Sequence, residues 1–342
     1  MMMYSFDDFL PQGECIATIQ NQILENRLVH ALLISGEPGT GKRSLARLFA
    51  AALLCSSENG VRPCGQCPDC LKVSLEEHPD LMILRKGEPL SGDVKKGRAT
   101  IPVDDIREII RRCSTFSFAA GKRVIIIEDA ESMTPQAQNC LLKILENPPE
   151  ETYFFLTSSH SEGLLITVKS RCRPVKLKPW PLDYITSALT KAGVEPQMAR
   201  KAAAASFGSI GTAMQLANDD QYWKVRSQAM DSFFQNNDRS AILAISQQWK
   251  DARNEADRLF NILEDGVHTL LRYRMGTLPA GQEEAFPLKW LRFARQAELK
   301  RFSFLLDRIA EARKQVAFNV SFQVLVEQLL LTFIGESEVW KK

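Results

Sequence analysis

Short apolar runs alternate with amphipathic segments through the first half of the chain, and this alternation predicts strands and helices in turn. Strands separated by helices favour a parallel sheet that is covered on both faces. The sequence therefore predicts an α/β domain over residues 1–180. Its expected strands cover residues 28–35, 80–85, 123–128, 152–158 and 173–178, with helices near 42–55, 102–115 and 134–146.

The pattern changes after Pro179, Trp180 and Pro181. Residues 181–217 contain three short helical stretches broken by glycines, which predict a small helical domain. From there to the end, apolar residues recur at spacings of three and four, as in amphipathic helices. We therefore expect an all-α C-terminal domain over residues 218–342.

A glycine-rich segment, GEPGTGKRS at residues 36–44, joins the first expected strand to the first expected helix. Strand, glycine loop and helix in this order are typical of the phosphate-binding P-loop. Gly36, Gly39 and Gly41 let the backbone N–H groups turn inward, and Lys42 can reach β- and γ-phosphates. The segment predicts a P-loop fold rather than a glycine turn beside an incidental lysine.

The expected magnesium position departs twice from an active P-loop ATPase. The residue after Lys42, which normally supplies a hydroxyl ligand, is Arg43, and a guanidinium has no lone pair to offer. The next acidic strand ends in Glu128 and Asp129, the reverse of the order that would bind Mg²⁺ and orient water. Misplacement by about 1 Å can cost about 10²-fold in rate. The plain alternative is that both are ordinary strand-end acids.

Four of the eight cysteines lie close together, as Cys55, Cys64, Cys67 and Cys70. Their spacing suits four thiolates around a tetrahedral Zn²⁺, and a glycine and prolines supply the tight turns. Four cysteine ligands leave no open position, so we expect a structural zinc site in an insertion at residues 55–70. The alternative is four reduced cysteines in a loop.

Several segments together resemble the clamp-loader branch of the AAA+ proteins, and within it the delta-prime subunit family of bacterial DNA polymerase III. The resemblance covers about residues 25–180. It implies a P-loop domain, a helical lid over 181–217 and a C-terminal collar. Besides the P-loop and the cysteines, it rests on residues 76–84, 101–110 and 132–159 and on Ser170, Arg171 and Cys172.

Three features favour the delta-prime subunit over the gamma/tau motor subunits. They are Arg43, the inverted pair Glu128 and Asp129, and Gly211, which stands where the motor subunits carry a sensor arginine. The resemblance therefore implies a subunit that does not hydrolyse ATP usefully. Because the loop glycines and Lys42 remain, the sequence leaves open whether nucleotide still binds.

Arg171, in contrast, implies a contribution to ATP hydrolysis in a neighbouring subunit. In the resembled family this arginine reaches across a subunit interface and acts as a finger on a neighbour's γ-phosphate, a role that contributes about 10³–10⁵ in rate elsewhere. The alternatives are a structural salt bridge or a phosphate contact to DNA. Thr157 matches the sensor-1 position of the family, and it could equally be an ordinary strand-end hydroxyl.

The resemblance implies gamma/tau and delta subunits as partners in a hetero-pentamer that places a sliding clamp on primed DNA. Lys and Arg number 43 against 41 Asp and Glu, a net charge of +2, so no general basic coat is present. No apolar run approaches about 18 residues and the N-terminus lacks a signal-peptide pattern, so we expect a cytoplasmic protein with no membrane contact.

The segment 287–314 combines eight basic and three acidic residues with interleaved aromatic side chains. It could bind nucleic acid, but we favour a helical oligomerisation collar. His30, His160 and His268 have no catalytic spacing and are interpreted as structural. Two other functions remain as alternatives. One is an active gamma/tau-like ATPase, and the other is a zinc-stabilised DNA-binding protein on an inactive ATPase scaffold.

Overall fold

The computed structural model describes residues 5–57, 61–88, 90, 99–113, 121–235, 238–278, 286–318 and 320–338. The chain divides into two compact units, Met1–Gln215 and Leu216–Lys342. The predicted division of the first part at residue 180 stays a prediction. Among the described residues, no helix is both long enough and apolar enough to cross a membrane.

A five-stranded parallel sheet forms the centre of the first unit, in the order β2-β3-β4-β1-β5. All five strands were predicted from the apolar runs. β4 occupies the middle of the sheet and is buried along its whole length, which explains the four consecutive apolar residues, Tyr153 to Leu156, at its centre. The strands are β1 (Ala31–Ser35), β2 (Leu81–Leu84), β3 (Arg123–Ile127), β4 (Thr152–Ser158) and β5 (Arg173–Lys176).

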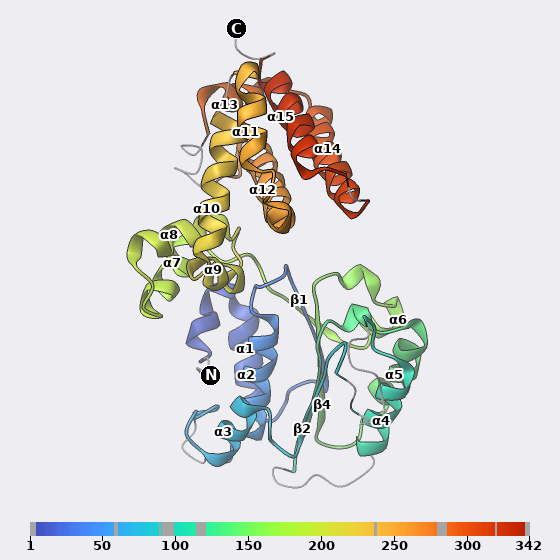
Figure 1. The fold of residues 1–342 in the computed structure, drawn as a ribbon. Coiled ribbons are helices and arrows are strands. Elements are labelled where there is room, and N and C mark those ends of the chain that lie inside the picture. Colours follow the sequence, from blue (N-terminus) through green and yellow to red (C-terminus); the bar gives the residue numbers. More distant parts are fainter. Residues whose placement is uncertain are drawn as a thin grey trace. The chain divides into compact units, whose positions relative to one another are not determined.

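Helices cover both faces of this sheet (Figure 1). One face carries α1 (Glu14–Leu24) and α2 (Lys42–Leu54), and the other carries α4 (Val103–Cys113), α5 (Pro135–Glu146) and α6 (Ile166–Lys169). Successive residues of a strand point to opposite faces. Phe155 therefore meets Phe49 of α2, with ring centroids 5.9 Å apart, while Phe154 belongs to the core beneath α4 and α5.

Some helices begin at a side-chain cap. α5 begins after Thr134, whose hydroxyl accepts a hydrogen bond from the N–H of Ala137, and Pro135 occupies the first turn. α3 (Pro68–Leu75) begins in the same way after Cys67, with Pro68 in its first turn. Three short helices follow the sheet, namely α7 (Leu182–Lys191), α8 (Pro196–Ala205) and α9 (Ile210–Ala217).

The described part of the second unit is all helical, as predicted. Its aromatic core is organised around Phe234, whose ring lies 5.2 Å from Trp290 and 5.5 Å from Phe333. Gly266 is required beside this ring, because a Cβ there would lie 2.5 Å from Phe234. Its α-helices include α10 (Asp220–Ala229), α11 (Ile242–Gln248), α12 (Ala256–Arg274), α13 (Leu288–Gln296), α14 (Leu299–Ala317) and α15 (Phe322–Glu338).

Candidate functional site

The P-loop has the predicted position between β1 and α2. Gly39 and Gly41 adopt left-handed backbone conformations, with φ of 73° and 95°, which glycine accepts without steric cost. Lys42 is the first residue of α2 and is buried. Its ammonium donates hydrogen bonds to the carbonyl oxygens of Gly36 and Glu37, both at 2.8 Å. Burial lowers the pKa of Lys42.

The segment that begins α9 packs directly against this loop. A Cβ added to Gly39 would lie 2.0 Å from the hydroxyl oxygen of Ser209. The N–H of Gly211 donates to the carbonyl of Gly39 at 3.1 Å. Trp180 donates from its indole nitrogen to the carbonyl of Thr40 at 2.8 Å. The predicted sensor position, Gly211, therefore contacts the P-loop through its backbone.

The acids after β3 are paired with arginines. Glu128 is 1% exposed, and its Oε2 lies 3.0 Å from Nε of Arg43 and 3.0 Å from Nε of Arg85. Its Oε1 lies 3.0 Å from Nη2 of Arg47. Asp129 Oδ2 lies 2.6 Å from Nη2 of Arg43. Both residues of the inverted pair are thus bound to the chain's own guanidinium groups.

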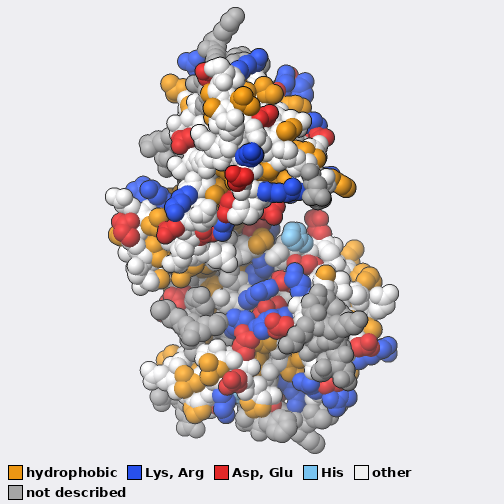
Figure 2. All heavy atoms as spheres, in the orientation of Figure 1, with side chains coloured by type: hydrophobic (Ala, Val, Ile, Leu, Met, Phe, Trp, Pro, Cys, Tyr) orange, Lys and Arg blue, Asp and Glu red, His pale blue; other side chains and the backbone are white. Residues whose placement is uncertain are grey.

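Glu76 extends this arrangement, because its two carboxylate oxygens lie 2.8 Å from Arg47 and 2.6 Å from Arg85. Burial alone would lower the pKa of Arg85, but hydrogen bonds to Glu76 and Glu128 raise it above its usual value. On the first unit, Figure 2 shows basic and acidic side chains interspersed. We call the three arginines and three acids the acid–arginine network, and its members are Arg43, Arg47, Arg85, Glu76, Glu128 and Asp129.

Thr157 lies at the end of β4, where it is fully buried. Its hydroxyl accepts a hydrogen bond from the N–H of Asp129 at 3.2 Å. Asp129 itself has a left-handed conformation, with φ of 49°, which aspartate tolerates better than most residues. The threonine therefore supports the backbone that carries the two acids.

The sequence patterns alone do not single out Arg47, Arg85 or Glu76. Arg43 and Arg47 are four residues apart on α2 and so share one helix face, which was a usable signal. Arg85 follows β2, and the sheet order places β2 beside β3. That neighbourhood is not visible in the sequence.

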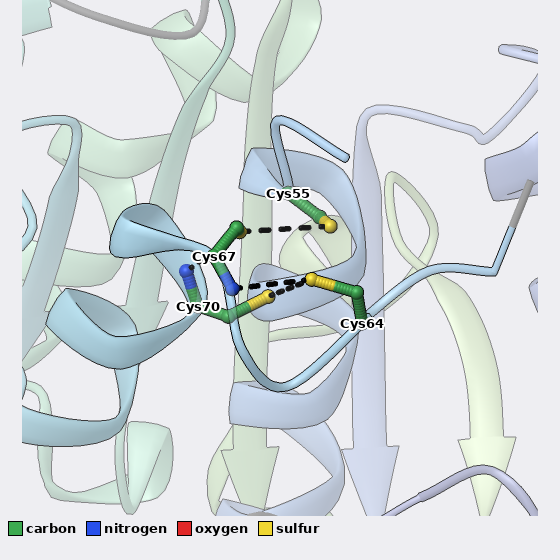
Figure 3. Close-up of side chains that lie close together, drawn as sticks. All are labelled: Cys55, Cys64, Cys67 and Cys70. Atoms are coloured by element: carbon green, nitrogen blue, oxygen red, sulfur yellow. Dashed lines mark hydrogen bonds between the residues drawn. The ribbon is translucent and has the colours of Figure 1, made fainter. Parts of the chain in front are cut away.

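The four predicted cysteines come together between the end of α2 and the start of α3 (Figure 3). Their sulfur atoms all lie within 4.8 Å of one another. Cys55 and Cys67 are 3.9 Å apart, and Cys64 and Cys70 are 4.0 Å apart, between sulfur atoms. Tetrahedral zinc with bonds of about 2.3 Å requires sulfur atoms roughly 3.8 Å apart. The cluster therefore fits one zinc ion.

Backbone N–H groups support the same sulfurs. The N–H of Cys67 donates to the sulfur of Cys64 and the N–H of Cys70 donates to that of Cys67, both at 3.3 Å. Burial alone would raise the pKa of the Cys67 thiol, but hydrogen bonds from Cys70 and Ser56 lower it to about 6. A thiolate is the form that binds metal, so the shift favours binding at Cys67, whereas burial raises the pKa of the Cys55 and Cys70 thiols.

Two histidines of the first unit make contacts away from these sulfurs. His78 is buried, and its Nδ1 accepts a hydrogen bond from the N–H of Asp80 at 3.1 Å. His30 contacts the carbonyl oxygen of Leu145 at 2.9 Å. The cluster that fits a metal is thus made of the four cysteines, without a histidine.

Arg171 lies between α6 and β5, and it is paired inside its own chain. Its Nη2 contacts the carboxylate of Glu146, the last residue of α5. Its Nη1 donates to the carbonyl oxygen of Thr167 at 2.9 Å. Its side chain is 32% exposed. Both of these partners lie outside the P-loop and outside the acid–arginine network.

The parallel sheet and the loop between β1 and α2 define a P-loop domain of the AAA+ type. The family model described as "DNA polymerase III, delta subunit" matches residues 11–181, half of the chain. The chain belongs to the DNA polymerase III delta-prime family of clamp-loader subunits.

Two relatives and one solved structure illustrate the similarity. The chain is 37% identical over 198 residues to DNA polymerase III subunit delta' of Escherichia coli K12, covering 58% of this chain and only 57% of that protein. It is 29% identical over 329 residues to subunit delta' of Bacillus subtilis 168, covering 94% of this chain and 95% of that protein. A DNA polymerase III gamma subunit-related protein of Thermotoga maritima is 16% identical, with 94% and 99% coverage and a TM-score of 0.48.

Proposed function

We propose that this chain is a non-hydrolysing subunit of the clamp loader of DNA polymerase III. It would act in the cytoplasm with gamma/tau and delta subunits, as one member of a hetero-pentamer that places the sliding clamp on primed DNA. Family membership supports the assembly. The acid–arginine network is the single observation that carries the non-hydrolysing role.

The network disfavours magnesium binding at the position where a P-loop ATPase would bind the ion. Every carboxylate oxygen of Glu128 has a guanidinium partner within 3.0 Å. A Mg²⁺ ion would have to displace these arginines, and it would also meet the positive charge of Arg43. Bound magnesium neutralises phosphate charge during hydrolysis, so its exclusion removes a main source of rate.

The packing around the P-loop supports the same role. Ser209 and Gly211 contact Gly39, and the ammonium of Lys42 is satisfied by loop carbonyls. A nucleotide phosphate would have to draw Lys42 away from these carbonyls. We therefore expect nucleotide binding to be weak, with no turnover following it.

Steady-state ATP turnover by the purified chain tests this proposal. We expect a rate at background level, and we expect Lys42→Ala to leave that rate unchanged. An active ATPase would turn over at about 1 s⁻¹ or faster. Turnover on that scale that disappears in Lys42→Ala would contradict the proposal and favour a gamma/tau-like motor.

Arg171 supports a contribution to a neighbour's site. Its guanidinium is partly exposed, and its partners Glu146 and Thr167 lie outside its own P-loop. An arginine that does not serve its own site can serve another, as fingers supplied in trans do. We therefore propose that Arg171 contacts the γ-phosphate bound by an adjacent subunit.

The C-terminal unit supports the collar over the DNA-binding alternative. Of the four aromatic residues that interleave with the basic residues, Trp290, Phe293 and Phe302 are at most 1% exposed, whereas Phe304 is 40% exposed. Buried rings cannot stack on bases. The basic residues of α13 and α14 then lie on the outer faces of helices whose inner faces form the core. This arrangement is consistent with an oligomerisation domain.

For the cysteine cluster we propose one structural zinc ion, held by Cys55, Cys64, Cys67 and Cys70. The ion would fasten α3 to the end of α2, because metal binding at such a site is coupled to folding. We expect about one zinc per purified chain and a loss of that zinc in Cys70→Ser. Cys15→Ser, at an exposed cysteine outside the cluster, is the matched control and should retain zinc. A folded wild-type chain without metal would contradict this prediction.

A further inference from the structure

We propose that Glu146 is a positioning residue that restrains Arg171 until a neighbouring subunit presents its nucleotide. This restraint depends on the proposed role of Arg171 as a finger in trans. It adds a second residue to that role and gives the isolated chain a resting state for its guanidinium.

The contacts of Arg171 define this resting state. One terminal nitrogen of the guanidinium pairs with the Glu146 carboxylate, and the other donates to the Thr167 carbonyl at 2.9 Å. Both terminal nitrogens are therefore engaged within the chain. A finger uses such nitrogens to contact phosphate oxygens, so at least one of these contacts must open when Arg171 acts.

The end of α5 explains why a guanidinium rests there. Glu146 is the last residue of α5, and Asn147, Pro148 and Pro149 follow it directly. The C-terminus of a helix carries partial negative charge, which favours a cation and disfavours an isolated carboxylate. Arg171 neutralises both the carboxylate and the helix end. The prolines stop the helix at a fixed residue and so hold Glu146 in place.

The pair is weak enough to exchange. Its side chains are 32% and 46% exposed, and ion pairs at such exposure are easily broken. A γ-phosphate carries more charge than a carboxylate and can accept two parallel hydrogen bonds from arginine. A phosphate within reach therefore competes successfully with Glu146. While the pair is closed, the carboxylate cancels the charge that a finger would apply to the transferred phosphoryl group.

The experiment uses the assembled clamp loader, reconstituted with wild-type chain, Glu146→Gln, Arg171→Ala or the double variant. Glutamine keeps the shape of the side chain and removes its charge. We expect Glu146→Gln to raise the ATPase kcat without clamp and DNA by about two- to fivefold, the scale of one exposed ion pair. The KM for ATP should stay within about twofold, because Glu146 does not bind the hydrolysed nucleotide.

The double variant separates restraint from a general structural effect. In the Arg171→Ala background, Glu146→Gln should change nothing, because no guanidinium is left to release. Glu150→Gln is the matched control, since Glu150 is an exposed acid four residues further on and should leave kcat unchanged. Equal thermal unfolding midpoints for all variants would show that folding is intact.

Two results would overturn the proposal in distinguishable ways. If Arg171→Ala lowers the rate but Glu146→Gln leaves it unchanged or lowers it, the finger stands and the restraint is wrong. If Arg171→Ala has no effect on the clamp- and DNA-stimulated rate, the finger itself is wrong and the restraint fails with it.

Discussion

Two arginine–carboxylate arrangements of the first unit have the same chemistry but differ in the burial of their central carboxylate. In the acid–arginine network, Glu128 is 1% exposed and contacts Arg43, Arg47 and Arg85. At the other position, Arg171 contacts one carboxylate, that of Glu146, and both side chains are partly exposed. In the function proposed above, the network occupies the position of the catalytic metal, and Arg171 of the exposed pair is the finger.

The difference in burial decides what each arrangement can do. A charge in the interior is stable only while its partners stay in place, because exposing or orphaning it has a large desolvation cost. A partly exposed pair exchanges readily with water or with another anion. The network is therefore suited to closing a site permanently, whereas the exposed pair is suited to opening when a better anion arrives.

The largest predicted effect comes from removing the central carboxylate of the network. Glu128→Gln leaves three guanidinium groups around a neutral amide, and breaking a buried ion pair on one side costs about 3–5 kcal/mol. Because Arg43 is half-exposed, we expect a loss near the lower end of that range. Hydrogen exchange of the β3 amides reports this local free energy directly.

Glu146→Gln provides the other arm of the comparison. The same chemical change at the exposed pair should reduce stability by less than about 1 kcal/mol. Similar losses of stability in Glu128→Gln and Glu146→Gln would show that burial does not distinguish the two arrangements. That result would remove the reason for assigning them different roles.

Much of the sheet could be predicted from the sequence, because its buried strands require apolar runs, although β5, which is only partly buried, mixes apolar and charged residues. The five runs, the P-loop between the first strand and helix, and the cysteine spacing are local signals. The alternation of strands and helices does not by itself require α1. The sequence nevertheless contained a signal for this helix, because Ile16, Ile19 and Ile23 lie on one face. β1 and β5 are shorter than predicted, since the outer residues lie beyond the paired register.

The acid–arginine network could be predicted only in part. Arg43 and the two acids were visible as departures from a motif, but an unfavourable residue in a motif does not reveal its contacts. Arg85 reaches Glu128 because β2 lies beside β3, and Ser209 reaches Gly39 because α9 folds back on the loop. Both contacts join residues that are distant in the sequence, so they depend on the tertiary structure.

Asp265, on α12 of the second unit, is a third carboxylate to compare with Glu128 and Glu146. It is partly buried, and its pKa is raised above the usual value. Burial raises its pKa from 3.8 to about 6, and Glu264 acts in the same direction. Arg226 and Arg272 lower the pKa by less. The nearby Tyr222 also has a raised pKa, for which burial is the main cause.

The sign of the pH effect follows from these values. Between about pH 4 and pH 6 the folded state holds a proton on Asp265 that the unfolded state has released. The contribution of Asp265 to stability is therefore complete below about pH 4, falls as the pH rises through about 6, and is absent above that. Asp265→Asn should remove this pH dependence and stabilise the second unit by about 1 kcal/mol at pH 7. This is less than the full pKa shift of Asp265 corresponds to, because the new amide also needs hydrogen-bond partners.

Hydrogen exchange of the α12 amides at pH 5 and pH 7 measures both the pH dependence and the stabilisation. A variant as pH-dependent as the wild type would show that Asp265 is solvated, and burial alone would then not separate this carboxylate from those of the network.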